Sequence, residues 1–264
     1  MTRPYSLDFL PYCEMKPCLP YKIAVIFLHP ACNMTCNFCI TENDFEALSP
    51  AQVSGLLTML KGEGFENVVF GGGEPFMWPG DLAALTQEAK QKGSVVQVGT
   101  NAVALPEGFE TIPAIDRYVL PLESVDQRVH NRMRFYKRKH HRIIINCLQK
   151  LKAARKSVTI STVVTRINHD GLKALASFLS RMDHPGGFIH AWHLYMFLPE
   201  GRGGRINAPD LLLGEDEFEG AVNGVKGLGL SFPVFKRKDM YCSKTVDFFW
   251  FQDGRLVRGS ALRR

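Results

Sequence analysis

The chain has 264 residues, of which 45% are hydrophobic and 22% charged, and its formal net charge is +6. These values are ordinary for a globular protein and exclude a disordered chain, a collagen-like repeat and a disulfide-stapled small domain. No apolar run approaches the roughly 20 residues that cross a bilayer, and the first eight residues lack the apolar core of a signal peptide. We therefore expect a soluble, cytoplasmic protein without a membrane partner.

Strands and helices alternate along the predicted chain. The first predicted helix begins at Ser49, a candidate N-cap, and Pro50 occupies its first helical position. Apolar, β-branched runs predict strands at residues 21–28, 67–70, 94–98, 117–120, 158–164 and 188–198. Apolar residues at helical spacing predict helices at residues 49–60, 81–92, 142–154, 170–181 and 215–225. The strand-like run at 245–251, followed by the turn at 252–254, predicts a hairpin.

This alternation predicts parallel strands joined by right-handed helical crossovers, in a sheet that is buried on both faces. The fold class is therefore α/β, and the pattern fits either a partial (β/α)6 barrel of parallel strands or a flat doubly wound sheet. No linker-like change of composition divides the chain. We expect one globular unit with a short N-terminal extension and a C-terminal β tail.

Three of the seven cysteines lie within eight residues, in the run Cys32-Asn-Met-Thr-Cys36-Asn-Phe-Cys39. This run follows the first predicted strand, in the loop at the carboxyl end where α/β barrels carry their chemistry. In a reduced protein, such clustering indicates metal or redox chemistry, and thiolates suit zinc or an iron–sulfur cluster. Three ligands leave one iron of a four-iron cluster open to another molecule. The alternative is a structural zinc site completed by a distant fourth ligand.

The CxxxCxxC spacing, with Phe38 directly before the third cysteine, resembles the radical S-adenosylmethionine (SAM) enzyme superfamily. Four further segments follow in the order usual for that family, so the resemblance covers roughly residues 21–205. We take this range as the radical SAM core of a partial barrel, between an extension at 1–20 and a C-terminal helix and β tail at 206–264 that caps the barrel. The single-cluster layout looks most like viperin-type nucleotide dehydratases and related small members.

The resemblance implies which residues hold the cofactors. Cys32, Cys36 and Cys39 would bind a 4Fe-4S cluster. The family uses a GGEP-type stretch to bind the amino group of SAM, and a carboxylate can hold an ammonium group; the corresponding residues are Gly72, Gly73, Glu74 and Pro75. The family's T-N-G turn corresponds to Thr100 and Asn101, with Ala102 where glycine is common. Asn101 would reach the ribose or the substrate, and the alternative is a turn residue that caps its own backbone.

The segment at 120–134 resembles the family's S-L-D-S…H-D-x-I-R-G segment. In the family, the arginine of this segment pairs with the SAM carboxylate. The resemblance assigns that role to Arg134, with Arg132 and Arg128 as competing candidates. Pro121 and Glu123 replace the usual serine and aspartate. The remaining predicted cofactor contacts are Phe38, Ser124 and Thr162. The strand-end patterns at 162–168 and 194–202 also match the family, although Asn168 fits equally as a helix N-cap and Arg202 as a solvated loop residue.

The resemblance implies an oxidoreductase or lyase-type enzyme that cleaves SAM reductively at the cluster. The resulting 5′-deoxyadenosyl radical would abstract hydrogen from a small molecule, with a nucleotide as one option, or from a peptide. An electron donor such as flavodoxin or ferredoxin would reduce the cluster. We expect no nucleic-acid partner, because the basic run at 132–142 has thin aromatic support and fits a solvated face.

Four cysteines remain outside the triplet. Cys242 is a candidate hydrogen donor to a product radical, which would suit a peptide- or protein-modifying enzyme. Cys13, Cys18 and Cys242 could instead share an auxiliary cluster. The alternative for all four is a small apolar residue, and we prefer this interpretation for Cys147, which falls on a predicted helix. A different class altogether is a zinc-binding structural or interaction module.

Overall fold

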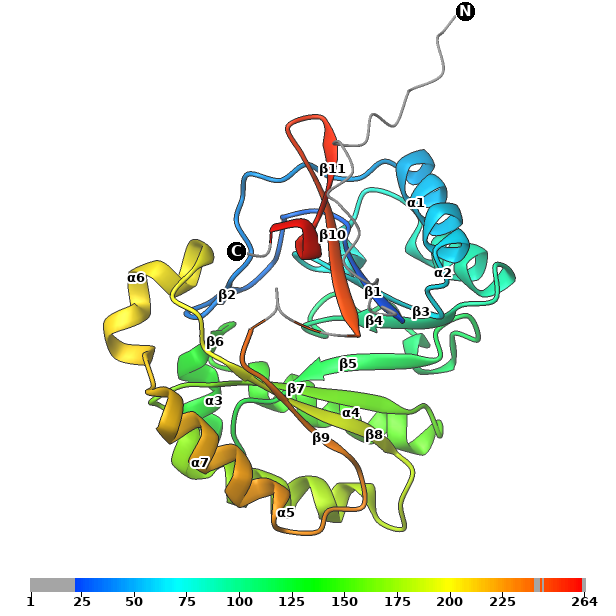
Figure 1. The fold of residues 1–264 in the computed structure, drawn as a ribbon. Coiled ribbons are helices and arrows are strands. Elements are labelled where there is room, and N and C mark those ends of the chain that lie inside the picture. Colours follow the sequence, from blue (N-terminus) through cyan, green and yellow to red (C-terminus); the bar gives the residue numbers. More distant parts are fainter. Residues whose placement is uncertain (1–21, 240–242, 244, 263–264) are drawn as a thin grey trace, which may run out of the picture.

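A computed structural model of the chain describes residues 22–239, 243 and 245–262 (Figure 1). The described residues form a nine-stranded sheet with the spatial order β11-β10-β1-β3-β4-β5-β7-β8-β9, and the α/β class with a partial parallel barrel is confirmed. The six predicted strands lie side by side in its centre and are all parallel. Their bounds are β1 (Ile23–Phe27), β3 (Asn67–Gly71), β4 (Val95–Gly99), β5 (Arg117–Pro121), β7 (Val158–Val164) and β8 (Ile189–Met196).

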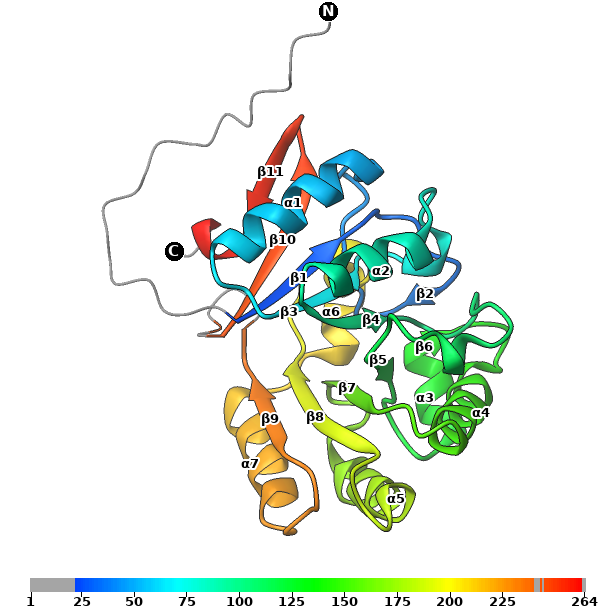
Figure 2. The ribbon, with the colours of Figure 1, turned by 90° about the vertical axis from the view of Figure 1, so that its right-hand side faces the viewer.

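The helices lie around the outside of the curved sheet, except α6, which lies at the end of the barrel that carries the cysteine loop (Figures 1 and 2). Their bounds are α1 (Pro50–Gly62), α2 (Leu82–Gln91), α3 (Gln127–Met133), α4 (His140–Ala153), α5 (Leu172–Asp183), α6 (Gly201–Leu211) and α7 (Glu215–Lys226). The predicted N-cap of α1 is confirmed, since Ser49 Oγ accepts the amide of Gln52 and the Gln52 side chain accepts the amide of Ser49. No helix in the described part of the chain is long and apolar enough to cross a membrane.

The C-terminal segment extends the sheet at both edges. β9 (Val234–Arg237) lies parallel to β8, whereas β10 (Val246–Gln252) lies parallel to β1. The predicted hairpin is confirmed, because β11 (Arg255–Arg258) pairs antiparallel with β10. Sequence patterns alone did not indicate that the tail would join the same sheet, because parallel pairing partners far apart in the chain leave no local signal.

The short helix α3 was not predicted, nor were two features beside the cysteine loop. β2 (Thr35–Cys36) and β6 (Arg134–Phe135) form a separate two-stranded sheet, and α6 follows β8 directly. The helix α6 begins with Gly-Arg-Gly-Gly, a composition that is typical of a loop, because glycine is among the weakest helix formers. Both features depend on contacts with the cysteine loop, which are described below.

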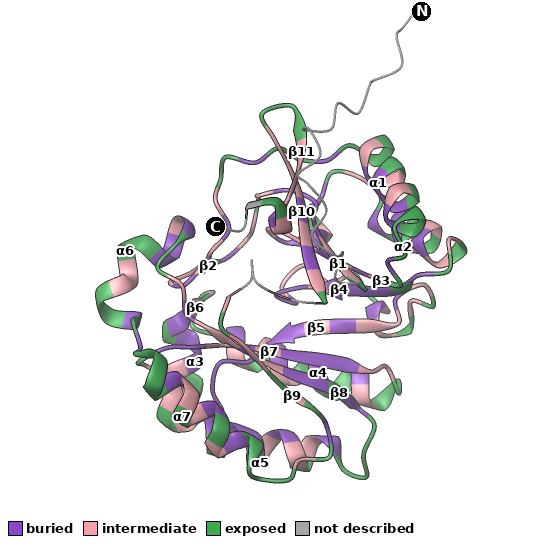
Figure 3. Ribbon diagram, viewed as in Figure 1, coloured by how far each residue is buried: buried purple, intermediate pink, exposed green. Residues whose placement is uncertain are grey.

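The main core lies between the sheet and the outer helices, and Figure 3 shows mostly buried strands and helices that are buried on one face. Side chains alternate along each strand, so one set faces the helices and the next faces the barrel interior. Thr162 and Trp192 illustrate the outward set, since both are fully buried and the Trp192 Nε1 donates to Thr162 Oγ1 at 2.9 Å. This packing turns the neighbouring residues, Ser161 and Val163, toward the interior.

Candidate active site

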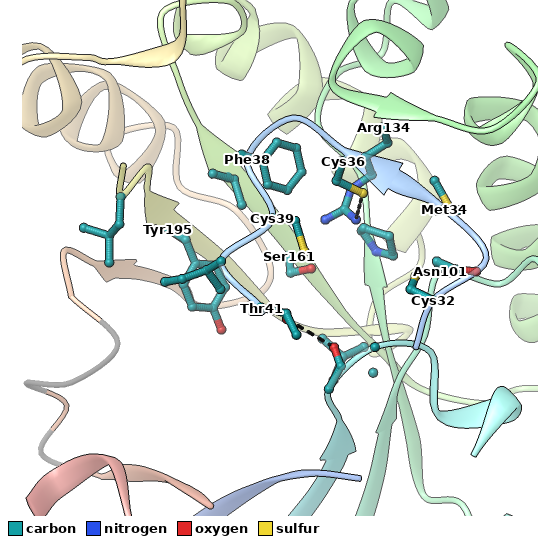
Figure 4. Close-up of a pocket in the computed structure, with 18 of the residues that line it drawn as sticks. Cys32, Met34, Cys36, Phe38, Cys39, Thr41, Asn101, Arg134, Ser161 and Tyr195 are labelled. Carbon is teal, nitrogen blue, oxygen red and sulfur yellow. Dashed lines mark hydrogen bonds between the residues drawn. The ribbon is translucent and has the colours of Figure 1, made fainter. Parts of the chain in front are cut away.

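A pocket of about 330 Å³ lies inside the partial barrel, toward the carboxyl ends of the parallel strands (Figure 4). One wall, which we call the cysteine wall, comes from loops; the residues that build or support it are Cys32, Cys36, Cys39, Gly72, Gly73, Glu74, Thr100, Asn101, Glu123 and Arg134. The other, the strand wall, comes from β7, β8 and β9; its polar residues are Ser161, Tyr195 and Arg237. The pocket therefore brings together thiol, polar and basic side chains from segments that are far apart in the sequence.

The three cysteines follow one another along the loop after β1, and all three line the pocket (Figure 4). Backbone pairing of β2 with β6 places Cys36 opposite Arg134. The helix α6 packs on the same loop so closely that a Cβ at Gly201 or Gly203 would lie 2.3 Å from its backbone atoms. The amide of Gly203 donates to the carbonyl of Cys39 at 3.0 Å. The glycine-rich run thus holds the cysteine loop, a role that its composition did not reveal.

The three cysteines of the loop are half-buried. Burial raises the pKa of the Cys36 thiol to about 11, although the guanidinium of Arg134 lowers it. Arg134 Nη1 lies 3.6 Å from Cys36 Sγ, and Asn101 Nδ2 lies 3.5 Å from Cys32 Sγ. Within the described residues, no three His, Cys, Asp or Glu side chains surround one ion position. Three cysteines along one wall fit a cluster, because each sulfur then binds a different iron.

The Gly72–Glu74 loop pairs with the backbone that leads into the cysteines. The amide of Gly73 donates to the carbonyl of His29 at 2.7 Å, and that of Glu74 donates to Ala31 at 2.8 Å. A Cβ at Gly73 would lie 1.8 Å from the carbonyl oxygen of Ala31, and Gly72 has a φ of +114°. Both glycines line the pocket, but close contact between the two loops is what requires them.

Glu74 follows β3 and is fully buried, and its carboxylate is hydrogen-bonded to the turn after β4. It accepts the Thr100 hydroxyl at 2.7 Å and the amide of Asn101 at 2.8 Å. Burial raises the pKa of Glu74, whereas these hydrogen bonds lower it. Glu74 and Pro75 are not among the residues that line the pocket. The expected contact of Glu74 with an ammonium group stays a prediction, and in the structure the carboxylate stabilises the neighbouring turn.

Asn101 faces the pocket, and its side chain also caps a turn. Its Nδ2 donates to Asn33 Oδ1 at 2.7 Å, and its Oδ1 accepts the amide of Val103 at 2.9 Å. Both predicted roles are therefore structurally compatible. Ala102 has a φ of +62°, the left-handed region that favours glycine, so it occupies a strained position.

Arg134 is held in place by a buried ion pair. Its Nε donates to Glu123 Oε1 at 2.6 Å, and the second carboxylate oxygen of Glu123 accepts the amide of Val163. The guanidinium carbon lies 4.8 Å from the centre of the Phe38 ring. Burial opposes the charge of Arg134, but the Glu123 carboxylate raises its pKa. The competing candidates, Arg132 and Arg128, are exposed and do not line the pocket.

Two buried histidines connect the ends of β4 and β5, and the sequence analysis did not single them out. The amide of Glu123 donates to His130 Nδ1, so His130 Nε2 carries the proton that it donates to His140 Nδ1 at 2.8 Å. His140 Nε2 then donates to the carbonyl of Asn101 at 2.8 Å. Burial lowers the pKa of His130 to about 2 and that of His140 to about 3, so both rings are neutral.

Several predicted residues lie away from the pocket. The hydroxyl of Thr162 donates to the carbonyl of Leu122 at 2.6 Å on the helix-facing side of β7. Ser124 Oγ accepts the amide of Asp126 at 3.0 Å ahead of α3. Asn168 does not cap a helix with its side chain, which donates to the carbonyls of Glu123 and Val163. Thr162 was a plausible choice from the strand-end pattern, but the alternation along β7 turns Ser161 inward instead.

The remaining cysteines divide into two groups. Cys147 is buried on α4, and burial raises the pKa of its thiol to about 12, in keeping with the role of a small apolar residue. Cys13, Cys18 and Cys242, with the predictions attached to them, lie outside the described residues.

A partial barrel of parallel strands with three thiols after its first strand is the architecture of an enzyme that uses SAM with an iron–sulfur cluster. The Radical SAM superfamily model matches residues 26–179, more than half of the chain, and the chain belongs to this superfamily of enzymes.

Among curated proteins, a GTP 3′,8-cyclase from Chlorobaculum tepidum is 26% identical over 162 residues, covering 58% of this chain and 48% of the relative. An S-adenosylmethionine-dependent nucleotide dehydratase from Lacinutrix mariniflava is 26% identical over 166 residues, covering 57% of this chain and 34% of the relative. The chain thus matches half or less of the length of these relatives. The crystal structure of Streptococcus suis SuiB bound to S-adenosylmethionine has a TM-score of 0.67 at 16% identity, covering 86% of this chain and 58% of that one. That likeness concerns the fold.

Proposed function

We propose that Cys32, Cys36 and Cys39 bind a 4Fe-4S cluster that carries SAM on its open iron, within a radical SAM core at residues 21–205. When bound, these groups supply one-electron cleavage of SAM and hydrogen abstraction from a substrate by the 5′-deoxyadenosyl radical. A reducing protein such as a flavodoxin or ferredoxin delivers the electron. The observation that carries the proposal is the position of all three cysteines on one wall of a pocket whose other described lining residues include no His, Cys, Asp or Glu.

The protein's own residues bind and orient the cofactor in this proposal. Arg134 carries the guanidinium that pairs with the SAM carboxylate, and Glu123 fixes its orientation by the 2.6 Å contact. The backbone of Gly72 and Gly73 and the side chain of Asn101 face the pocket and hold the rest of the SAM head group. Glu74 acts as a positioning residue, because its carboxylate holds the Thr100–Asn101 turn. Apolar side chains such as Phe27 and Met34 limit water at the site.

The substrate is a small molecule or a peptide, as the names of the relatives illustrate. A nucleotide is the substrate class favoured by the two curated relatives, one named as a GTP cyclase and the other as a nucleotide dehydratase. A structure of SuiB bound to a precursor peptide supports the peptide option. Hydrogen donation by Cys242 would belong to that option.

Anaerobic reconstitution with iron and sulfide tests the proposal. Wild-type protein should become brown, bind about four irons per chain and form 5′-deoxyadenosine from SAM with dithionite. Cys36→Ala should lose both the visible absorption and the 5′-deoxyadenosine. Cys147→Ala is the matched control and should retain both, because that cysteine is buried on α4 away from the pocket. Colourless protein that holds zinc would instead support the structural-module alternative, and wild-type iron content in Cys36→Ala would contradict the cluster assignment.

A further inference from the structure

The pocket carries positive charge and no negative side chain. Four basic residues line it, and no Asp or Glu does so among the described residues; the four are Arg134, Arg202, Arg237 and Lys238. Three of them already have partners. Arg134 pairs with Glu123, Lys238 pairs with Glu215 and Glu219, and Arg202 donates to the carbonyl of Pro30 and the side chain of Asn43.

Arg237 differs from the other three. Its Nε donates to the ring nitrogen Nδ1 of His193 at the long distance of 3.4 Å, and its guanidinium carbon lies 5.2 Å from the centre of the Phe235 ring. No carboxylate of a described residue lies within 4 Å of it. Burial lowers the pKa of His193 to about 3, and the charge of Arg237 lowers it further, so His193 is a neutral acceptor. Among the described residues, the charge of Arg237 therefore has no carboxylate partner on the pocket wall, where charges are usually paired.

The strand register places further donors beside this charge. Val163, Tyr195 and Arg237 are paired in one row across β7, β8 and β9, and all three line the pocket. The hydroxyl of Tyr195 has only a 3.4 Å contact with His193, and the structure gives no hydrogen bond for the hydroxyl of Ser161, one row below. Figure 4 shows the Tyr195 and Ser161 side chains among the pocket residues, and in this view Ser161 lies beside Cys39. A cation with one weakly bonded hydroxyl and one hydroxyl without a hydrogen bond nearby is a suitable arrangement for an oxyanion.

We propose that Arg237, with Tyr195 and Ser161, binds an anionic group of the substrate, a phosphate or a carboxylate. This inference rests on the proposed function, since it assigns the substrate of the same pocket. In this proposal, the anion of the substrate and the carboxylate of SAM bind to different arginines. Arg134 lies opposite Cys36 on the cysteine wall and is the residue proposed to bind the SAM carboxylate, whereas Arg237 lies on β9 in the strand wall. A planar guanidinium binds either oxyanion through two parallel hydrogen bonds.

Ligand-observed NMR on the cluster-loaded protein tests this site with two probe anions, inorganic phosphate by its phosphorus linewidth and acetate by saturation transfer. Wild-type protein should bind at least one of them saturably in the presence of excess SAM. Arg237→Gln should weaken binding by about tenfold or more, as expected for the loss of a charged hydrogen bond. Arg255→Gln is the matched control, because it removes the same charge from an exposed position on β11 and should bind as wild type does.

Two further variants refine the test. Arg237→Lys keeps the charge without the planar fork and should fall between wild type and Arg237→Gln. Tyr195→Phe should weaken binding by a smaller factor. Tighter binding of phosphate would identify a phosphorylated substrate, and tighter binding of acetate a carboxylate; either result supports the site.

Three outcomes would overturn the inference: equal binding by wild type and Arg237→Gln, equal weakening by Arg255→Gln, or displacement of the probe by SAM. The last result would assign Arg237 to the SAM carboxylate. Failure of the proposed function would be visible separately. In that case wild-type protein carried through the same reconstitution would bind the probe anion but would not take up iron or form 5′-deoxyadenosine from SAM.

Discussion

The two walls of the pocket differ in how far their polar groups are already paired. On the cysteine wall, the Glu74 carboxylate, the Asn101 amide and the Glu123–Arg134 pair are all hydrogen-bonded within the protein. On the strand wall, Arg237 and Tyr195 have only long contacts with His193. A wall whose groups are held before binding suits a ligand that is the same in every turnover. On a wall whose hydrogen-bond donors are free, the bound substrate supplies the acceptors.

This difference has an energetic counterpart. Paired buried groups stabilise the fold, and removing one partner leaves the other desolvated and unsatisfied. Free donors that face a pocket contribute little to folding. Substitutions on the cysteine wall should therefore lower the free energy of unfolding, whereas those on the strand wall should leave it nearly unchanged. The four predictions below test this contrast in order of expected size.

Glu123→Ala should have the largest effect. Arg134 would stay in a site where its side chain is 14% exposed but would have no carboxylate. Breaking a buried pair in this way costs about 3–5 kcal/mol of unfolding free energy. The measurement is urea unfolding followed by circular dichroism. Glu66→Ala is the control, because its pair with Lys22 is more than half exposed on both sides and should contribute less than about 1 kcal/mol. Equal losses in the two variants would contradict the contrast.

Gly73→Ala should cause the second-largest loss of unfolding free energy. The new Cβ would lie 1.8 Å from the carbonyl oxygen of Ala31, so the two loops would have to separate. Overpacking of this kind costs about 1–3 kcal/mol, and the displaced cysteine loop should also take up less iron. Gly55→Ala is the opposite case, because a Cβ there meets no atom within 4 Å in the middle of α1. It should stabilise the protein by up to about 1 kcal/mol, and a loss of stability there would count against this account.

The buried histidines should make the cysteine wall sensitive to acid. The pKa values of His130 and His140 are lowered to about 2 and about 3 in the fold, whereas an unfolded chain takes up these protons near pH 6.5. The unfolded state therefore binds more protons as the pH falls below 6.5, and stability decreases toward pH 3. Between pH 6.5 and 5.5 each histidine should remove about 1 kcal/mol.

Urea unfolding across this pH range checks the expectation. His140→Gln removes one of the two groups, so its stability should depend less steeply on pH than that of wild type. His184→Gln removes an exposed histidine and should keep the wild-type slope. An unchanged slope in His140→Gln would show that the neutral His130–His140 chain does not contribute.

Ser161→Ala should have the smallest effect. The structure gives the hydroxyl of Ser161 no hydrogen bond, and the residue faces the pocket. We expect the unfolding free energy to change by less than about 0.5 kcal/mol, measured in the same urea series. A loss comparable to that of Gly73→Ala would mean that the strand wall is as tightly paired as the cysteine wall.

The sequence predicted the parts of the fold that depend on local patterns. Six strands, the capped helix α1 and the hairpin of β10 and β11 follow from apolar periodicity, an N-cap and a turn, which a chain carries over a few residues. The motifs that line the cysteine wall were also visible, because the cysteines, the glycine pair and Asn101 occur in short runs. Even there the direction of a side chain was not determined, as the carboxylate of Glu74 demonstrates.

What only the tertiary structure decided is which distant segments meet. The pairing of Cys36 with Arg134, the packing of the α6 glycines on the cysteine loop and the row of Val163, Tyr195 and Arg237 all join residues that are tens of residues apart or more. Hydrogen bonds between strands and backbone contacts between loops carry no sequence-local signal, because any partner with the right geometry satisfies them. The sequence alone therefore determined the motifs for the cofactor, whereas the proposed substrate wall emerged only when the sheet brought its edge strands to the same pocket.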